Sequence, residues 1–104
     1  MLAFATTKTF AQKQTYTSTS SRAIKNLEQA LKYYDSRQTT KAITEAENAI
    51  KADPGFIEAY MLLGDLHADN NNLPAAIEAY KKAVAVNPRF FPNNLYALGR
   101  YELE

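Results

Sequence analysis

The chain contains the same eight-residue pattern twice, at an interval of 34 residues. The pattern reads AIKADPGF at 49–56 and AVAVNPRF at 83–90, with Asp or Asn before a proline and Phe two residues after that proline. The further pairs that keep this interval are Ala42 and Ala76, Ile43 and Ile77, Leu27 and Met61, and Ala30 and Gly64. Because chance rarely puts small residues and prolines in register over a whole unit, the chain is built from repeats.

The sequence predicts two helices in each unit. Apolar residues at three-four spacing predict helices over 23–35, 41–52 and 57–70, and a fourth from about Leu73. Turns are expected over 36–39 and 70–72, and Asp53-Pro54 and Asn87-Pro88 end the second helix of each unit, because a residue before proline avoids the helical conformation. Ala30 and Gly64 are expected where paired helices approach closely. Aromatic residues are expected to fill the gaps: Tyr33, Phe56, Tyr60, Tyr80 and Phe90.

A third unit begins near the end of the chain, where Leu98-Gly99 restates Leu63-Gly64 at an interval of 35 residues. The predicted fold is therefore all-α, a solenoid of antiparallel helix-turn-helix repeats over 22–104. It comprises two repeats (23–56 and 57–90) and the first helix of a third (91–104). This last helix has no stop sequence before Glu104. We expect a truncated stretch of a longer protein rather than a capping helix, which would turn a polar face outward.

Residues 57–90 resemble a tetratricopeptide repeat. The residues that carry the resemblance are Tyr60, Leu63, Gly64, Ala76, Tyr80, Ala83 and Pro88, with His67 in place of the usual tyrosine. Residues 23–56 are a weaker copy, in which Asn26 and Ala46 replace aromatic residues. The resemblance implies a non-enzymatic scaffold that binds a protein or peptide on its concave face.

The resemblance also implies which positions of each first helix face the groove. The partner-binding residues expected from it are Tyr34, Glu58, Met61, Asp65, Asn93, Tyr96 and Arg100, with Ile24, Leu27, Leu31 and Ala68 at further groove positions. The alternative is that the N-terminal segment or a preceding element covers the groove positions of the first unit. Leu27, Leu31 and Leu62 stand where one subset of the family carries a Lys and Asn clamp for chaperone tails, so that kind of partner is not expected.

The amino-acid composition argues against a catalytic site and against several classes of partner. Charged residues make up 22%, the net charge is +1, cysteine is absent and His67 is the one histidine. Nucleic-acid and lipid binders need a basic patch, and a membrane span needs about 20 apolar residues, so neither partner nor direct membrane insertion is expected. Asp65 and Asp69 share a helix face but lack a third ligand and read as a solvated surface. No catalytic, cofactor or metal site is predicted, although the apolar end allows the fragment to self-associate.

The first residues of the chain resemble part of an export signal. Residues 1–11 resemble the remnant of a signal peptide cleaved after Ala11, and the polar residues 12–21 read as a flexible lead-in. Such a leader before repeats is similar to the N-terminal part of Gram-negative OmpA-like envelope proteins, which implies a periplasmic or outer-membrane-associated location. The alternatives are a docking or regulatory domain of an enzyme encoded beyond Glu104, and a small cytoplasmic adaptor with an uncleaved leader.

Overall fold

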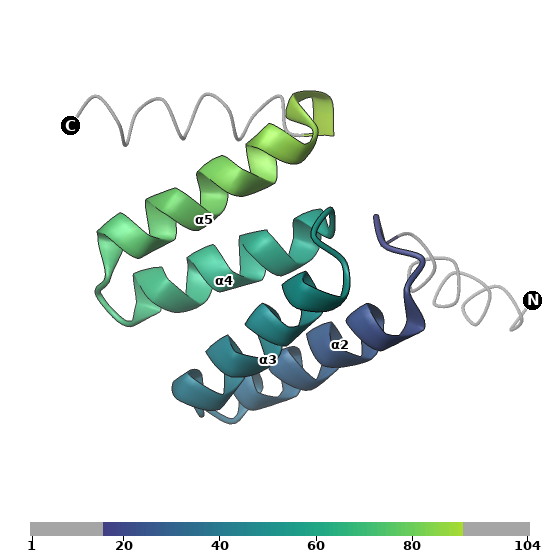
Figure 1. The fold of residues 1–104 in the computed structure, drawn as a ribbon. Coiled ribbons are helices and arrows are strands. Elements are labelled where there is room, and N and C mark those ends of the chain that lie inside the picture. Colours follow the sequence, from purple (N-terminus) through teal and green to yellow (C-terminus); the bar gives the residue numbers. More distant parts are fainter. Residues whose placement is uncertain (1–15, 91–104) are drawn as a thin grey trace, which may run out of the picture.

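The computed structural model describes residues 16–90. They form four α-helices and a closing 3-10 turn: α2 (Ser21–Asp35), α3 (Thr39–Ala52), α4 (Ile57–Asp69), α5 (Leu73–Val86) and η1 (Pro88–Phe90). α2 pairs with α3, α4 pairs with α5, and the second pair stacks on the first through α3 and α4 (Figure 1). The predicted all-α arrangement of two helix pairs is confirmed. The predicted third unit, 91–104, and the leader, 1–11, lie outside the described residues.

The helix ends follow local sequence chemistry. The Ser20 hydroxyl accepts a hydrogen bond from the Ala23 amide at 3.1 Å, and the Asn72 side chain does the same for the Ala75 amide at 3.3 Å. Asp53 and Asn87 have extended backbones with φ of −148° and −157°, as residues before proline require. The helices α2 and α3 begin two residues earlier than the sequence predicted.

The turn inside each helix pair uses one residue in the left-handed conformation. Asn71 has a φ of 59°, within the predicted turn over 70–72, and Arg37 has a φ of 62° at the equivalent position of the first repeat. Asparagine tolerates this conformation well and arginine does not, so only the second repeat has a favourable turn residue here.

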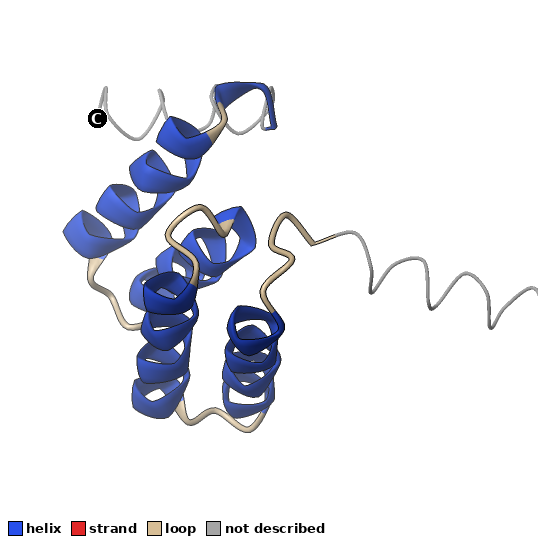
Figure 2. Ribbon diagram, turned by 45° about the vertical axis from the view of Figure 1, so that its right-hand side comes forward, coloured by secondary structure: helices blue, strands red, loops and turns tan. Residues whose placement is uncertain are grey.

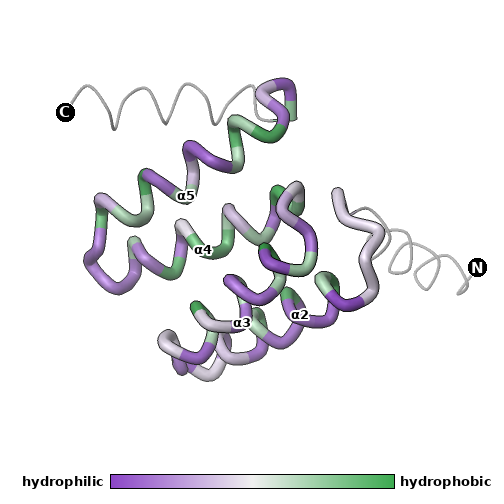
Figure 3. Tube along the Cα trace, in the orientation of Figure 1, coloured by the Kyte–Doolittle hydropathy of each residue, from purple (hydrophilic) through white to green (hydrophobic). Residues whose placement is uncertain are grey.

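The core consists largely of alanines, which let helices approach closely. Figure 3 shows apolar and polar residues interspersed along the helices. α4 is buried on two sides, because Ala59 and Leu66 join the core of the first helix pair whereas Ile57 packs with Ala83 of α5. The buried apolar residues are Ala23, Leu27, Ala30, Ala42, Ala46, Ala49, Phe56, Ile57, Ala59, Leu62, Leu66, Ala76, Ala79 and Ala83. Leu27 was expected to face the groove, but it is 2% exposed, because it packs into the core with α3 and α4.

Gly64 lies directly against the ring of Tyr80, as its predicted role in close helix approach requires. A Cβ at Gly64 would lie 2.5 Å from the nearest ring carbon. In the first repeat the positions equivalent to Gly64 and Tyr80 hold Ala30 and Ala46, and both alanines are fully buried. The second repeat thus pairs a large residue with a glycine, whereas the first repeat pairs two small residues.

Two predicted features are corrected. Phe90 was expected to fill a gap, but it is 44% exposed in η1 at the edge of the described stack, whereas Phe56 lies buried between the two helix pairs.

Residues 16–21 belong to the predicted flexible lead-in, yet they make specific contacts. Ser18 is buried, Tyr16 packs on Phe56, and Ser21 already belongs to α2. Figure 2 shows the described segment before α2 as a loop beside the helix pairs. The polar composition of this segment did not indicate that one aromatic ring and three hydroxyl groups in it have specific contact partners.

Candidate functional site

The candidate site is the face where the first helices of the two repeats, α2 and α4, lie beside each other. One hydrogen bond joins the two helices directly, and the segment before α2 lies at the other end of the face. At one end the Tyr34 hydroxyl of α2 donates a hydrogen bond to Asp69 of α4 at 2.6 Å. At the other end Tyr16 lies near Glu28 of α2 and Glu58 of α4. The predicted groove positions Tyr34 and Glu58 therefore lie at the two ends of this face, whereas Leu27 is buried in the core.

Between these two ends, the predicted groove positions hold apolar side chains and one carboxylate. Leu31 of α2 is 38% exposed, Met61 of α4 is half-buried, and Asp65 of α4 is exposed. Asp65 accepts a hydrogen bond from the Tyr80 hydroxyl of α5. Asp65 and Asp69 are both exposed, as the interpretation of a solvated surface predicted, and each carboxylate also accepts a hydrogen bond from a tyrosine of a neighbouring helix. This contact fixes the position of Asp65, while Met61 packs in part against Ile57 and Ala83.

The Tyr34–Asp69 pair has a titration consequence. The hydrogen bond to Asp69, together with partial burial and the nearby charges of Asp69 and Asp65, raises the pKa of Tyr34 from 10.0 to about 12. The neutral phenol is the form that donates, so this end of the groove keeps its hydrogen bond throughout the physiological pH range.

The opposite end of the surface is already occupied by the chain itself. The Thr17 amide lies 3.2 Å from each carboxylate oxygen of Glu58, and the Thr17 hydroxyl donates to Glu58 Oε1 at 2.6 Å. This resembles the alternative in which the N-terminal segment covers groove positions, except that the bonded position, Glu58, belongs to the second repeat. Of the other predicted groove residues, Asn93, Tyr96 and Arg100 lie outside the described part of the chain.

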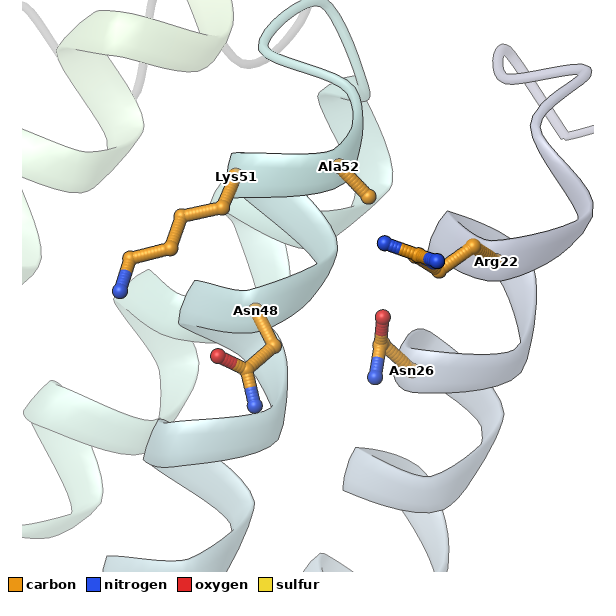
Figure 4. Close-up of a pocket in the computed structure, with 5 residues that line it drawn as sticks. All are labelled: Arg22, Asn26, Asn48, Lys51 and Ala52. Carbon is orange, nitrogen blue, oxygen red and sulfur yellow. The ribbon is translucent and has the colours of Figure 1, made fainter.

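Two hollows lie elsewhere on the described surface. One of about 430 Å³ lies between α2 and α3 (Figure 4) and is lined by Arg22, Asn26, Asn48, Lys51 and Ala52. The other, of about 560 Å³, lies between α3, α4 and α5 and is lined by Glu47, Ile50, Lys51, Tyr60, Leu63, His67, Ala75, Glu78, Ala79 and Lys82. His67 is half-buried there, as its aromatic repeat position predicted. Sequence reasoning missed both hollows, because they depend on how neighbouring helices splay apart.

Neither a metal centre nor a membrane span is found between residues 16 and 90. Within that range no three His, Asp or Glu side chains come together in a way that would hold a metal ion. The helices of the same range are also too short or too polar to cross a bilayer.

Comparison with known proteins agrees with the helix-pair geometry. A family model described as "Tetratricopeptide repeat" matches residues 27–94. A tetratricopeptide repeat domain-containing protein PYG7, chloroplastic, from Arabidopsis thaliana is 35% identical over 60 residues, which is 58% of this chain and 19% of that protein. The chain thus spans about a fifth of the length of this curated relative.

Proposed function

The chain belongs to the tetratricopeptide repeat family, and we propose that it is a non-enzymatic interaction module whose α2–α4 face binds a peptide or protein partner. The observation that carries the proposal is that the predicted groove positions between the two ends of that face are accessible: Leu31 is exposed, Met61 is half-buried, and the exposed carboxylate of Asp65 is held by Tyr80. Apolar contacts with a few fixed polar groups are typical of surfaces that recognise a partner.

A rigid frame supports this interpretation. Hydrogen bonds of Tyr34 and Tyr80 tie α4 to α2 and to α5, so the α2–α4 face is held in shape before a partner arrives. A preorganised surface loses less conformational freedom on binding, and more of the contact free energy then appears as affinity.

The proposal is tested by placing a photo-crosslinking amino acid at position 31 and, as a matched control, at Leu73. Leu73 is an exposed leucine of α5, 58% exposed, and it belongs to no predicted groove position. We expect a partner from the native cells to crosslink through position 31 and not through position 73. Leu31→Glu should weaken binding of that partner by at least about tenfold, as loss of an interface anchor does, while Leu73→Glu leaves binding unchanged.

Circular dichroism of both variants checks that the helices persist. A partner that is lost with Leu73→Glu and retained with Leu31→Glu would place the binding surface elsewhere and refute the proposal.

The wider setting proposed for the module is a larger cell-envelope protein. Its support is the leader-like composition of residues 1–11 and their position before the repeats. N-terminal sequencing and the intact mass of the native polypeptide test it. A mature chain beginning at Gln12 supports export, and a retained Met1 on an 11.7 kDa polypeptide favours the small adaptor instead.

A further inference from the structure

The first turn of α4 takes its cap from a distant part of the chain. The residue before this helix, Phe56, provides no side-chain cap. Instead the Ile57 amide donates a hydrogen bond to the Thr17 hydroxyl at 3.1 Å, across 40 residues of sequence. The same hydroxyl donates to Glu58, so one threonine satisfies both an unpaired helix amide and the acidic residue beside it.

The residues around Thr17 add an aromatic and a buried contact. The Tyr16 ring meets the Phe56 ring edge-on, with centroids 5.9 Å apart and an interplanar angle of 75°. Ser18 is 4% exposed, and its hydroxyl accepts a hydrogen bond from the Ser20 amide at 3.0 Å. Residues 16–18 therefore lie at the start of α4 as a short bound peptide would. The Tyr16 ring meets Phe56, and the amide and hydroxyl of Thr17 both bond to Glu58.

The main groups that receive this segment lie at the junction of the two repeats, at the start of α4. They are the ring of Phe56, the amide of Ile57 and the carboxylate of Glu58. The segment is joined directly to α2, which begins at Ser21, so its local concentration at the site is high, in the millimolar range typical of short tethers.

Building on the proposed function, we propose that the start of α4 is a subsite for an extended peptide with an aromatic residue followed by threonine or serine. Residues 16–18 are its resident occupant. An outside peptide of the same chemistry must compete with them, and it gains the advantage through further contacts with Leu31 and Met61 along the α2–α4 face. The chain thus selects partners that engage the subsite and the apolar middle together.

A synthetic peptide of residues 12–21, QKQTYTSTSS, is the probe. It is titrated into isotope-labelled full-length chain while the amide resonances of Ile57 and Glu58 are followed by NMR. The Tyr16→Ala/Thr17→Val double variant removes the resident ring and hydroxyl from the subsite without changing its receiving groups. We expect the peptide to bind this variant at least about threefold more tightly than it binds the wild type, because competition by the resident segment is removed.

Two controls accompany the titration. Thr44→Val changes an exposed threonine of α3, whose hydroxyl bonds only within its own helix to the Thr40 carbonyl, and it should bind the peptide as the wild type does. A peptide with the tyrosine and first following threonine replaced, QKQTAVSTSS, should move neither resonance. Thr17→Val alone serves if the double variant unfolds, with the same direction and a smaller change.

Equal affinity of wild type and opened variant, or equal binding of the substituted peptide, would overturn the proposal. So would unmoved Ile57 and Glu58 resonances in the folded, opened variant at several millimolar peptide. None of these readouts needs the native partner. Failure here with crosslinking still seen at position 31 refutes the subsite alone, and peptide binding without such crosslinking refutes the proposed function alone.

Discussion

At the scale of single residues, two carboxylates of α4 are fixed by tyrosines from opposite sides. Asp69 accepts from Tyr34 of α2 and Asp65 from Tyr80 of α5. A hydroxyl bonded to a carboxylate is a charge-assisted contact, stronger than a neutral one. The alanines pack α4 against its neighbours in the core, and these two hydrogen bonds hold α4 between α2 and α5 on the exposed side.

Tyr34→Phe should lower the free energy of unfolding at pH 8 by about 1 kcal/mol, the usual net value of one hydrogen bond. The folded-state pKa of Tyr34 is raised from 10.0 to about 12, so its contribution is complete below pH 10 and is lost as the pH rises toward 12. The difference between wild type and Tyr34→Phe should therefore shrink between pH 10 and pH 12. Urea unfolding at several pH values measures it. Tyr33→Phe is the matched control, since it keeps the ring that faces Lys41, and a difference that grew with pH would contradict the assignment.

Arg37 offers a stabilising substitution. Its φ of 62° is unfavourable for a residue with a Cβ, whereas the second repeat places Asn71 at the equivalent turn position. Arg37→Asn should raise the free energy of unfolding by a few tenths of a kcal/mol and Arg37→Gly by up to about 1 kcal/mol. Chemical denaturation measures both, and Asn71→Ala should have the opposite effect. A loss of stability in Arg37→Gly would mean that the arginine side chain stabilises the fold by more than its backbone costs.

At the scale of helices, the contact of α4 with α5 depends on the absence of one methyl group. A Cβ at Gly64 would lie within 2.8 Å of three atoms of the Tyr80 ring. In an open helix Gly→Ala stabilises by about 1 kcal/mol, but overpacking costs about 1–3 kcal/mol, so Gly64→Ala should destabilise overall. In a Tyr80→Ala background the ring is gone and Gly64→Ala should become stabilising. This change of sign is measured by a double-mutant cycle, and additive effects would show that the ring moves aside freely.

The helices could be predicted from the sequence because their causes are local. Three-four spacing, the prolines at 54 and 88 and the asparagine turn fixed the bounds to within two residues at the starts of α2 and α3. The 34-residue interval also identified the small residues at close contacts. The contacts of the α2–α4 face could not be predicted in the same way. Tyr34 and Asp69 are 35 residues apart, and their meeting depends on how two helices lie beside each other.

The segment before α2 was beyond prediction for a different reason. Its sequence, rich in threonine and serine, has no apolar periodicity, and composition of this kind indicates a solvated chain. Its contacts come instead from single groups, above all the ring of Tyr16 and the hydroxyl of Thr17. Sequence patterns detect faces that recur, and they miss isolated side chains that meet a distant helix end.

At the scale of the whole molecule, most of the buried apolar residues of the described chain belong to two clusters of unequal size. The larger cluster joins α2 and α3 to Phe56, Ala59, Leu62 and Leu66, so the first helix of the second repeat belongs to the core of the first. The smaller cluster contains Ile57 and Ala83, with Tyr60, Met61 and Val84 against it. The outer residues Leu73 and Val86 of α5 are 58% and 42% exposed. Stability should therefore decrease from the α3–α4 contact toward α5.

Native-state amide hydrogen exchange tests this gradient. We expect α3 and α4 to exchange only through global unfolding and α5 through a lower-energy local opening. Leu66→Ala removes a fully buried side chain of the larger cluster at a cost of about 2–5 kcal/mol, and should lower the protection of α2, α3 and α4 together. Val84→Ala, in the smaller cluster, should lower the protection of α5 and leave α2 and α3 unchanged. If Leu66→Ala affected only α4 and α5, the two repeats would unfold independently, and the shared core would not be the element that joins them.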